Sequence, residues 1–300
     1  MRILLQFPEG LKRIALKKAG ELEGNGHEVF VSSSPCYGAC DLAVEEAKRV
    51  KAGKIIHFGH SEYLKVEGGP EIVYEEYPLE VDWKPVLEKA LKELEKFERI
   101  GLLTTVQHAK QLGEVKEFLE EKGKLVFVGK GSIAKHPGQV LGCDVNAAYS
   151  IEEKIDCFLF FGGGFFHPLA VDTRKPMLAT DPFSNQAKWM GEELERWRKR
   201  RKGMLLKAAS SQTFGIIVST KTGQFDLEKA LEIKKKLEKA GKKAVVLVSN
   251  ETNFESLKNF NSFECFVNTA CPRIWMDYER AEAPIINAVD LEPLLKQWLE

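Results

Sequence analysis

The sequence of 300 residues lacks the features of several protein classes. It holds only six cysteines, too few for a secreted scaffold built on disulfides. No apolar run approaches the about 18 residues of a membrane span, and the short apolar N-terminus ends at Pro8, so we expect neither membrane anchor nor signal peptide. Lys plus Arg equal Asp plus Glu at 44 each, which argues against direct nucleic-acid binding. These absences predict a cytoplasmic globular protein.

Short apolar runs instead alternate with charged stretches of helical period, a pattern typical of parallel sheets covered by helices. We expect strands at Arg2–Phe7, His27–Ser32, Lys54–Phe58, Ile100–Thr104, Lys124–Gly129, Asp156–Phe161, Gly215–Ser219, Lys243–Ser249 and Glu264–Asn268. We expect helices at Leu11–Glu23, from Asp41 onward, at Ala109–Lys122 and at Asp226–Ala240, with connecting helices at Lys84–Glu98 and Asn185–Lys202. The predicted fold class is α/β.

The same plan recurs along the chain, which indicates internal repeats. The string IGLLTT matches GIIVST, KLVFVGKG matches KAVVLVSN, and DCFLFFGGG matches ECFVNTACP. We therefore predict three pseudo-symmetric α/β domains around a central site, at 1–98, 99–203 and 204–300. This number exceeds the two domains that the length alone suggests.

One cysteine stands in a loop of each predicted domain, beyond the end of a strand. Cys40 and Cys143 each follow a glycine-containing turn and precede an aspartate, and Cys271 follows the third strand of its domain. Parallel α/β sheets build their sites at these strand ends. A helix start beside Cys40 and Cys143 would favour the thiolate form.

Three thiolates cannot close a four-ligand structural zinc site, but they can hold three irons of a [4Fe–4S] cluster and leave the fourth open. The alternative is that these cysteines are small buried residues without a ligand role. That second interpretation is our expectation for Cys157 and Cys265, which lie inside predicted strands. Cys36 stands close to Cys40 and is a possible spare ligand.

Four motifs in this order, GAC-D, HPGQVLGC, GGGFFHP and NTACPRI, make the sequence resemble the diphthamide synthase family. The resemblance covers about residues 1–290. It implies a homodimer of three-domain chains with a [4Fe–4S] cluster bound by Cys40, Cys143 and Cys271.

The resemblance also implies the reaction. S-adenosylmethionine binds at the open iron, and an external electron donor drives reductive cleavage of its Cγ–S bond. The 3-amino-3-carboxypropyl group is transferred by a radical mechanism to C2 of a histidine imidazole in translation elongation factor 2, with methylthioadenosine as by-product. The chain is then a transferase that acts in the first step of diphthamide biosynthesis.

Several residues near the predicted strand ends are candidates for binding S-adenosylmethionine, although loop capping, tight turns and structural salt bridges explain them equally well. They are Gln6, Gly38, Gln107, Gly142, Gly162, Gly163 and Arg273. The basic run Arg196–Lys202 is interpreted as a solvated helix end, with steering of the protein substrate as the alternative.

Two other functions stay open at this stage. A quinolinate-synthase-like dehydratase would share three α/β units and a three-cysteine cluster but would use no S-adenosylmethionine. A non-catalytic partner subunit would only hold a cluster for electron delivery. Release of methylthioadenosine separates the first from the proposed transferase, and activity without a partner chain separates the second.

Overall fold

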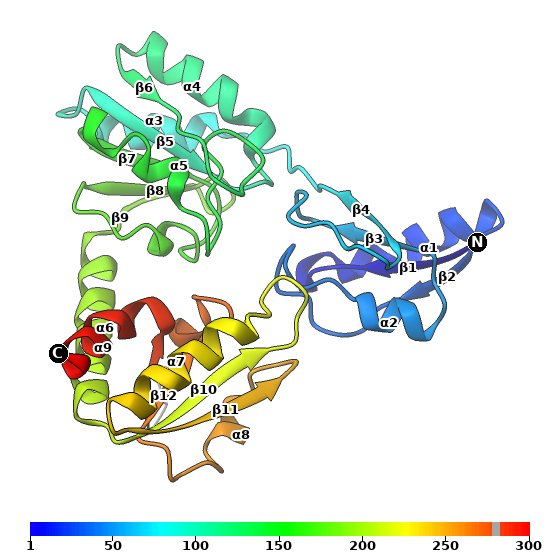
Figure 1. Ribbon diagram of the computed structural model, residues 1–300. Helices are drawn as coiled ribbons and strands as arrows, with labels where there is room; N and C mark the ends of the chain where they lie inside the picture. The colour runs from blue at the N-terminus through cyan, green and yellow to red at the C-terminus, as the bar shows by residue number, and fades with distance from the viewer. Residues whose placement is uncertain (278–282) are drawn as a thin grey trace. The chain divides into compact units, whose positions relative to one another are not determined.

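A computed structural model describes residues 1–277 and 283–300 and contains three separate sheets, each flanked by helices (Figure 1). The chain divides into two compact units, Met1–Glu193 with the first two sheets and Leu194–Glu300 with the third. The α/β class expected from the sequence is confirmed. The domain boundaries 1–98, 99–203 and 204–300 remain a prediction. No helix within the described residues is both long and apolar enough to cross a bilayer.

The first sheet has the strand order β2-β1-β3-β4 and is parallel throughout. The 3-10 helix η1 and helix α1 follow β1, and α2 precedes β3. Side chains of α1 pack on one face of the sheet and those of α2 on the other, so β1 is apolar on both faces. The bounds are β1 Arg2–Gln6, η1 Glu9–Ile14, α1 Ala15–Gly24, β2 Glu28–Val31, α2 Val44–Arg49, β3 Lys54–Phe58 and β4 Glu71–Glu75.

The second sheet has the order β6-β5-β7-β8-β9, parallel except for β9, which runs antiparallel to β8. Helices α3 and α4 cover one face with a continuous apolar core. The bounds are α3 Lys84–Glu93, β5 Arg99–Thr104, η2 Ala109–Gln111, α4 Leu112–Glu121, β6 Leu125–Phe127, α5 Asn146–Tyr149, η3 Glu152–Lys154, β7 Cys157–Phe161, η4 Pro168–Ala170, β8 Met177–Asp181 and β9 Gln186–Trp189.

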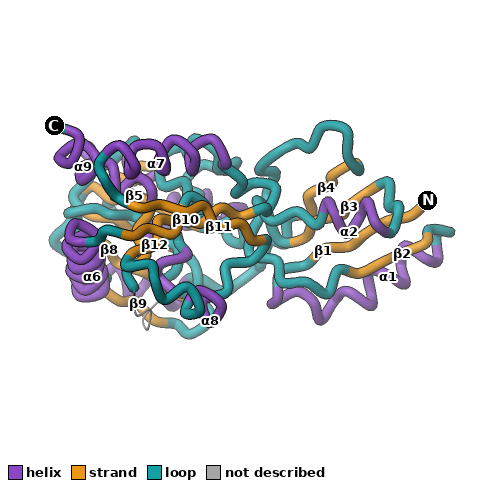
Figure 2. Tube along the Cα trace, turned by 60° about the horizontal axis from the view of Figure 1, so that its bottom comes forward, coloured by secondary structure: helices purple, strands orange, loops and turns teal. Residues whose placement is uncertain are grey.

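The third sheet is parallel in the order β11-β10-β12-β13. Helices α7 and α9 pack on one face, while α8 and part of α6 pack on the other (Figure 2). The bounds are α6 Gly191–Ser210, β10 Thr213–Ser219, α7 Leu227–Lys239, β11 Lys243–Ser249, α8 Phe254–Leu257, β12 Cys265–Asn268, η5 Ile274–Asp277, β13 Ile285–Asn287 and α9 Ala288–Leu299.

In all three sheets the first four strands lie in the same order: second, first, third and fourth along the chain, and the second sheet adds β9 at its edge. The repeat is therefore real, but two of the matched strings slip by one residue. The strand register makes Gly101 equivalent to Gly215 and Leu125 equivalent to Lys243, whereas the string match paired Ile100 with Gly215. A one-residue slip matters because it exchanges the two faces of a strand.

Three helix predictions need correction. The expected helix Asn185–Lys202 is instead the edge strand β9 followed by α6, because the segment around Trp189 pairs with Leu178 of β8. The helix expected from Asp41 begins three residues later, at Val44. The helix expected over Leu11–Glu23 starts with the 3-10 turns of η1 before α1 begins at Ala15.

Candidate functional site

Cys40 lies in a tight turn after β2, at the C-terminal edge of the first sheet. The Asp41 N–H donates to the Gly38 carbonyl at 2.9 Å, so the four residues from Gly38 form one hydrogen-bonded turn. A Cβ added to Gly38 would stand 3.7 Å from the Cys40 sulfur, so the glycine leaves the space beside the thiol open. The turn thus presents Cys40, which is partly exposed.

Gln6, at the end of β1, anchors this turn with both ends of its amide. Its Nε2 donates to the Asp41 carbonyl at 2.6 Å, and its Oε1 accepts the Ala43 N–H at 3.1 Å. The Nδ1 of His57, from β3, lies 2.9 Å from the same Oε1. Since Gln6 is 3 % exposed, these contacts account for its amide by positioning the Cys40 turn.

Cys143 lies in a loop of the second sheet that differs from the Cys40 turn. Here the Leu141 N–H donates to the Asp144 carbonyl at 2.8 Å, so the donor comes before the acceptor in the chain, whereas in the Cys40 turn it comes after. This hydrogen bond closes a loop that contains Gly142. The buried Asp144 carboxylate accepts the N–H groups of Ile133 and Ala134 at 2.5 and 2.8 Å. Burial opposes ionisation of Asp144, but these backbone donors prevail and lower its pKa.

The expected stabilisation of a Cys143 thiolate is not observed. Cys143 is exposed as a residue, yet burial of its sulfur is the main cause that raises the thiol pKa, and the nearby Cys40 and Asp144 raise it further. The Tyr63 hydroxyl, 3.9 Å from the sulfur, acts in the opposite direction. Helix α5 begins only at Asn146 and has four residues, too few for a substantial dipole at Cys143.

The Tyr63 hydroxyl, from the loop after β3, lies 3.9 Å from the Cys143 sulfur, so a loop of the first sheet reaches this cysteine. Thiols on loops fixed by Gln6 and by Asp144 are suited to act as ligands of an iron–sulfur cluster. Neither loop depends on a disulfide, because all six cysteines are thiols.

Cys271 lies in the second compact unit, in the loop after β12, and is partly exposed. Two asparagines hold this loop. Asn268 Nδ2 donates to the Cys271 carbonyl at 2.7 Å and to Asn287 Oδ1 at 2.9 Å, and Asn287 Nδ2 donates to the Pro272 carbonyl at 3.0 Å. Each of the three cysteines thus stands on a loop fixed by a buried polar side chain, and each is available at a strand end.

The remaining cysteines divide as follows. Cys157 and Cys265 are fully buried in the cores of the second and third sheets, as predicted. Burial raises the pKa of Cys157 to about 12, so this thiol stays protonated. Cys36 is also buried, but it lies beside His57 and His60 and outside the sheet cores.

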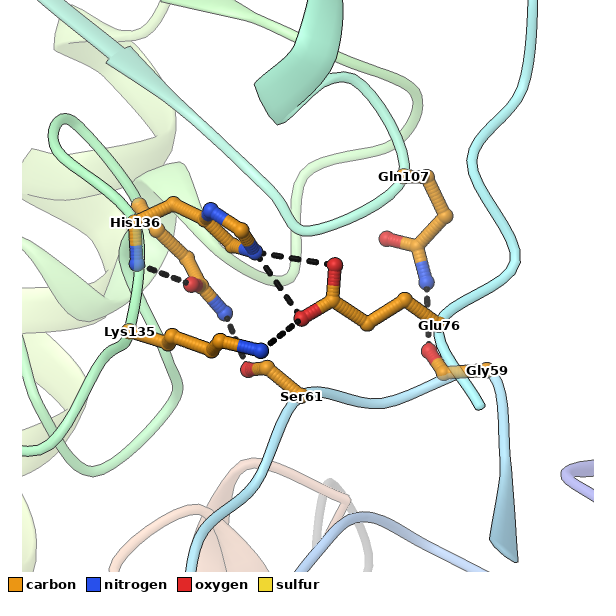
Figure 3. Close-up of polar contacts among 7 residues, drawn as sticks. Gly59, Ser61, Glu76, Gln107, Lys135 and His136 are labelled. Carbon is orange, nitrogen blue, oxygen red and sulfur yellow. Dashed lines mark hydrogen bonds and ion pairs between the residues drawn. The ribbon is translucent and has the colours of Figure 1, made fainter. Parts of the chain in front are cut away.

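Gln107 connects the first two sheets instead of facing an open pocket. Its Nε2 donates to the Gly59 carbonyl at 3.1 Å, as Figure 3 shows. We call this region of contact between the loops of the first two sheets the seam. In the seam, Glu76 also pairs with His136 at 2.9 Å and with Lys135 at 3.2 Å. Gln139 Nε2 also donates to the Ser61 hydroxyl at 3.2 Å. These contacts fix the loops after β3 and β4 against the loops of the second sheet.

The glycine run after β7 is only partly available to a ligand. The Gly162 N–H donates to the Thr180 carbonyl at 3.0 Å and so extends the pairing with β8. A Cβ at Gly163 would stand 3.7 Å from the Asp181 carboxylate, within ordinary contact. His108 packs beside this run against Phe161 and Phe183, and its buried Nδ1 has no hydrogen-bond partner among the described residues.

Arg273 is 4 % exposed, and its guanidinium lies 6.0 Å from the Trp197 ring centroid. It therefore lies next to the basic run of α6. That run is not a solvated helix end, because Arg196–Lys202 occupies the middle of α6 and Arg201 pairs with the buried Asp290 carboxylate.

Sequence reasoning missed several polar residues of these loops. His57, His60, Tyr63, Asn268 and Asn287 were not singled out, although four of them stand at or just past strand ends. That placement, which drew attention to Gln6 and Gln107, was the available signal.

The comparisons with known proteins agree with this architecture. The family model described as putative diphthamide synthesis protein matches residues 7–300. The 2-(3-amino-3-carboxypropyl)histidine synthase of Pyrococcus horikoshii is 42% identical over 299 residues, 98% of this chain and 85% of that protein. Subunit 1 of the synthase from Schizosaccharomyces pombe is 28% identical over 298 residues, 95% of this chain and 68% of that protein.

Solved structures give the same result. The crystal structure of Dph2 from Pyrococcus horikoshii aligns with a TM-score of 0.88 and 40% identity, over 99% of this chain and 86% of that one. A second structure of Dph2 from that organism, with a 4Fe-4S cluster, aligns equally well. These matches confirm the family resemblance inferred from the four motifs, and the chain belongs to the diphthamide synthesis family.

Proposed function

We propose that this protein transfers the 3-amino-3-carboxypropyl group of S-adenosylmethionine to C2 of a histidine imidazole in translation elongation factor 2. One observation carries the proposal: in a chain that matches the family over residues 7–300, each of the three repeated sheets presents one thiol on a fixed loop at a strand end. The products are the modified histidine and methylthioadenosine.

Cys40, Cys143 and Cys271 are the proposed ligands of a [4Fe–4S] cluster, one from each repeat. A reduced cluster supplies the electron that cleaves the Cγ–S bond, chemistry that no side chain provides. An external donor must therefore deliver that electron. The loops contribute by holding the thiols: Gln6 fixes the Cys40 turn, Asp144 fixes the Cys143 loop, and Asn268 fixes the Cys271 loop.

The other candidates take narrower roles in this proposal. Gln6 and Gln107 act as positioning residues, since their amides already bond to the backbone of the first unit. Gly38 and Gly163 leave space beside their loops, Gly142 lies within the turn that the Leu141–Asp144 hydrogen bond closes, and Gly162 extends the pairing with β8. Arg273, two residues after Cys271, is proposed to contact the methionine carboxylate. We further propose a cytoplasmic homodimer, without nucleic-acid or membrane binding.

The test uses the full chain, reconstituted anaerobically with iron and sulfide and supplied with a chemical reductant. Wild-type protein should bind about four irons per chain and move label from the carboxypropyl carbons of S-adenosylmethionine to elongation factor 2. Cys143→Ala should lower iron content and abolish transfer, because one ligand is lost. Cys157→Ala is the matched control and should retain both, since that thiol lies in the core.

Two results would contradict the proposal. A Cys143→Ala protein with full iron content and transfer would remove the ligand assignment. Wild-type protein that carries a cluster yet releases no methylthioadenosine would point instead to the dehydratase or to a subunit that only delivers electrons.

A further inference from the structure

A second group of metal-binding side chains lies beside the Cys40 turn and includes none of the three proposed cluster ligands. Cys36, His57 and His60 each turn one donor atom toward the others, and these atoms lie within 4.8 Å of one another. Cys36 is 5 % exposed, His57 is fully buried and His60 is partly buried. We call this group the Cys36–His57–His60 cluster.

The surrounding hydrogen bonds determine which ring nitrogens carry protons. Gln6 must direct Nε2 to the Asp41 carbonyl and Oε1 to the Ala43 N–H, so its Oε1 can only accept from His57 Nδ1. His57 then carries its proton on Nδ1 and a lone pair on Nε2. In the absence of a metal, that lone pair accepts a hydrogen bond from His60 Nδ1–H at 2.9 Å.

This arrangement is the one that metal-binding histidines adopt. A ligand histidine usually donates its second N–H to an oxygen, which fixes the ring and exposes the other nitrogen to the metal. Gln6 does this for His57. Burial lowers the pKa of His57 to about 3 and that of His60 to about 4, so both rings are neutral near pH 7 and retain lone pairs.

We propose that the Cys36–His57–His60 cluster binds one divalent cation of the zinc class, separate from the iron–sulfur cluster. One thiolate and two imidazoles suit a borderline metal such as Zn²⁺ and do not suit Mg²⁺ or Ca²⁺, which prefer oxygen. A tetrahedral zinc ion needs donors about 3.3–3.8 Å apart. The two facing ring nitrogens, now 2.9 Å apart, would therefore separate slightly, and the Cys36 sulfur, which lies within 4.8 Å of the other donor atoms, would move closer to them.

Binding releases one proton: the Cys36 thiol loses its proton to solvent. The proton that His60 holds on Nδ1 moves to its Nε2, so both imidazoles bind in their neutral forms through the nitrogens that face each other, and water completes the fourth position. The bound ion would connect the segment before the Cys40 turn to the end of β3, and it would therefore add to the contacts that hold this turn.

The first experiment measures zinc and iron in the intact, cluster-loaded chain after removal of loosely bound metal. Wild-type protein should retain about one zinc beside about four irons. Cys36→Ser should lose the zinc and keep the iron, and Cys157→Ala should keep both. Zinc retention that does not depend on Cys36 overturns the proposal. Loss of iron in Cys36→Ser overturns it too, because Cys36 would then be a cluster ligand.

A second experiment separates this site from the proposed function. In a Cys40→Ser/Cys143→Ser/Cys271→Ser chain, which cannot form the cluster, Co²⁺ should give a thiolate-to-cobalt charge-transfer band and tetrahedral ligand-field bands. Adding Cys36→Ser should remove the charge-transfer band, and adding His60→Asn should weaken Co²⁺ binding by at least about tenfold. An unchanged band in the Cys36→Ser background would refute the site, whatever the outcome of the transfer assay.

Discussion

Gln6 shows how much of the site depends on single buried amides. It joins β1 to the Cys40 turn through Asp41 and Ala43 and orients His57 at the same time. Three groups therefore rely on one side chain that is 3 % exposed. A buried polar group that loses its partner has no hydrogen bond to protein or to water, and this destabilises the folded state.

We expect Gln6→Leu to destabilise the chain by about 2 kcal/mol, because a buried donor or acceptor without a partner costs about 1–3 kcal/mol. Urea denaturation of the full chain should show this as a lower midpoint. Gln186→Leu, at an exposed position of β9, is the control and should change little. Equal stability of Gln6→Leu and wild-type protein would show that the Cys40 turn does not depend on this amide.

At the residue scale, the sequence predicts the surroundings of some cysteines better than those of others. Cys157 and Cys265 could be assigned to the core because strand periodicity determines burial. The environment of Cys36 could not be foreseen, since His57 and His60 are more than twenty residues away in sequence. The raised pKa of Cys143 also depends on burial and on Tyr63 from another sheet. Such contacts are properties of the tertiary structure.

At the scale of elements, the second and third repeats share a strand glycine that packs against a phenylalanine of the neighbouring strand. The alignment of the two sequence strings was shifted by one residue and did not pair these glycines. Gly101 in β5 and Gly215 in β10 occupy equivalent positions, and each faces a phenylalanine of the third strand in its sheet. A Cβ on Gly101 would stand 2.9 Å from Phe158 Cδ1, and one on Gly215 would stand 2.7 Å from Phe266 Cδ1. The glycines leave room for these rings.

Gly101→Ala and Gly215→Ala should each destabilise the protein by about 1–3 kcal/mol, because a buried ring must shift in a close-packed core. Gly113→Ala is the matched control. Gly113 lies in α4 with open space around it, so alanine should raise stability by about 0.5–1 kcal/mol through helix propensity. Differential scanning calorimetry of the three variants measures these effects. A neutral Gly101→Ala would mean that Phe158 and Ile155, whose Cδ1 would lie 2.7 Å from the new Cβ, both have room to move.

The sequence predicted the central strands well, because continuous apolar runs such as Cys157–Phe161 are buried on both faces. It did not predict the edge strand β9 or the first residue of α2. The segment Gln186–Trp189 is amphipathic and short, so only its pairing with β8 makes it a strand. The start of α2 depends on Gln6 and Asp41, which hold the preceding residues in a turn.

At the scale of the whole molecule, the seam between the first two sheets decides how Cys40 and Cys143 are held within the unit Met1–Glu193. The Glu76 carboxylate, from the first sheet, contacts both His136 and Lys135 of the second sheet's loops (Figure 3). Burial alone raises the pKa of Glu76, but its hydrogen bonds with His136 and Lys135 outweigh this and lower it.

A carboxylate whose pKa is lowered by folding stabilises the folded state when the pH is above the pKa of the unfolded chain, about 4.3 for glutamate. This contribution disappears as the pH falls through the pKa of the folded state. We therefore expect Glu76→Gln to lower the melting temperature of the Met1–Glu193 unit at pH 7, and the difference from wild-type protein to shrink as the medium becomes acidic. Glu75→Gln removes an exposed carboxylate from the preceding position and should have a much smaller effect at either pH. Calorimetry across this pH range provides the measurement.

A difference in melting temperature that stays constant into acid would show that Glu76 acts through packing and not through its charge. A clear pH dependence would identify the ion pairs as the force that holds the loops of the two sheets together.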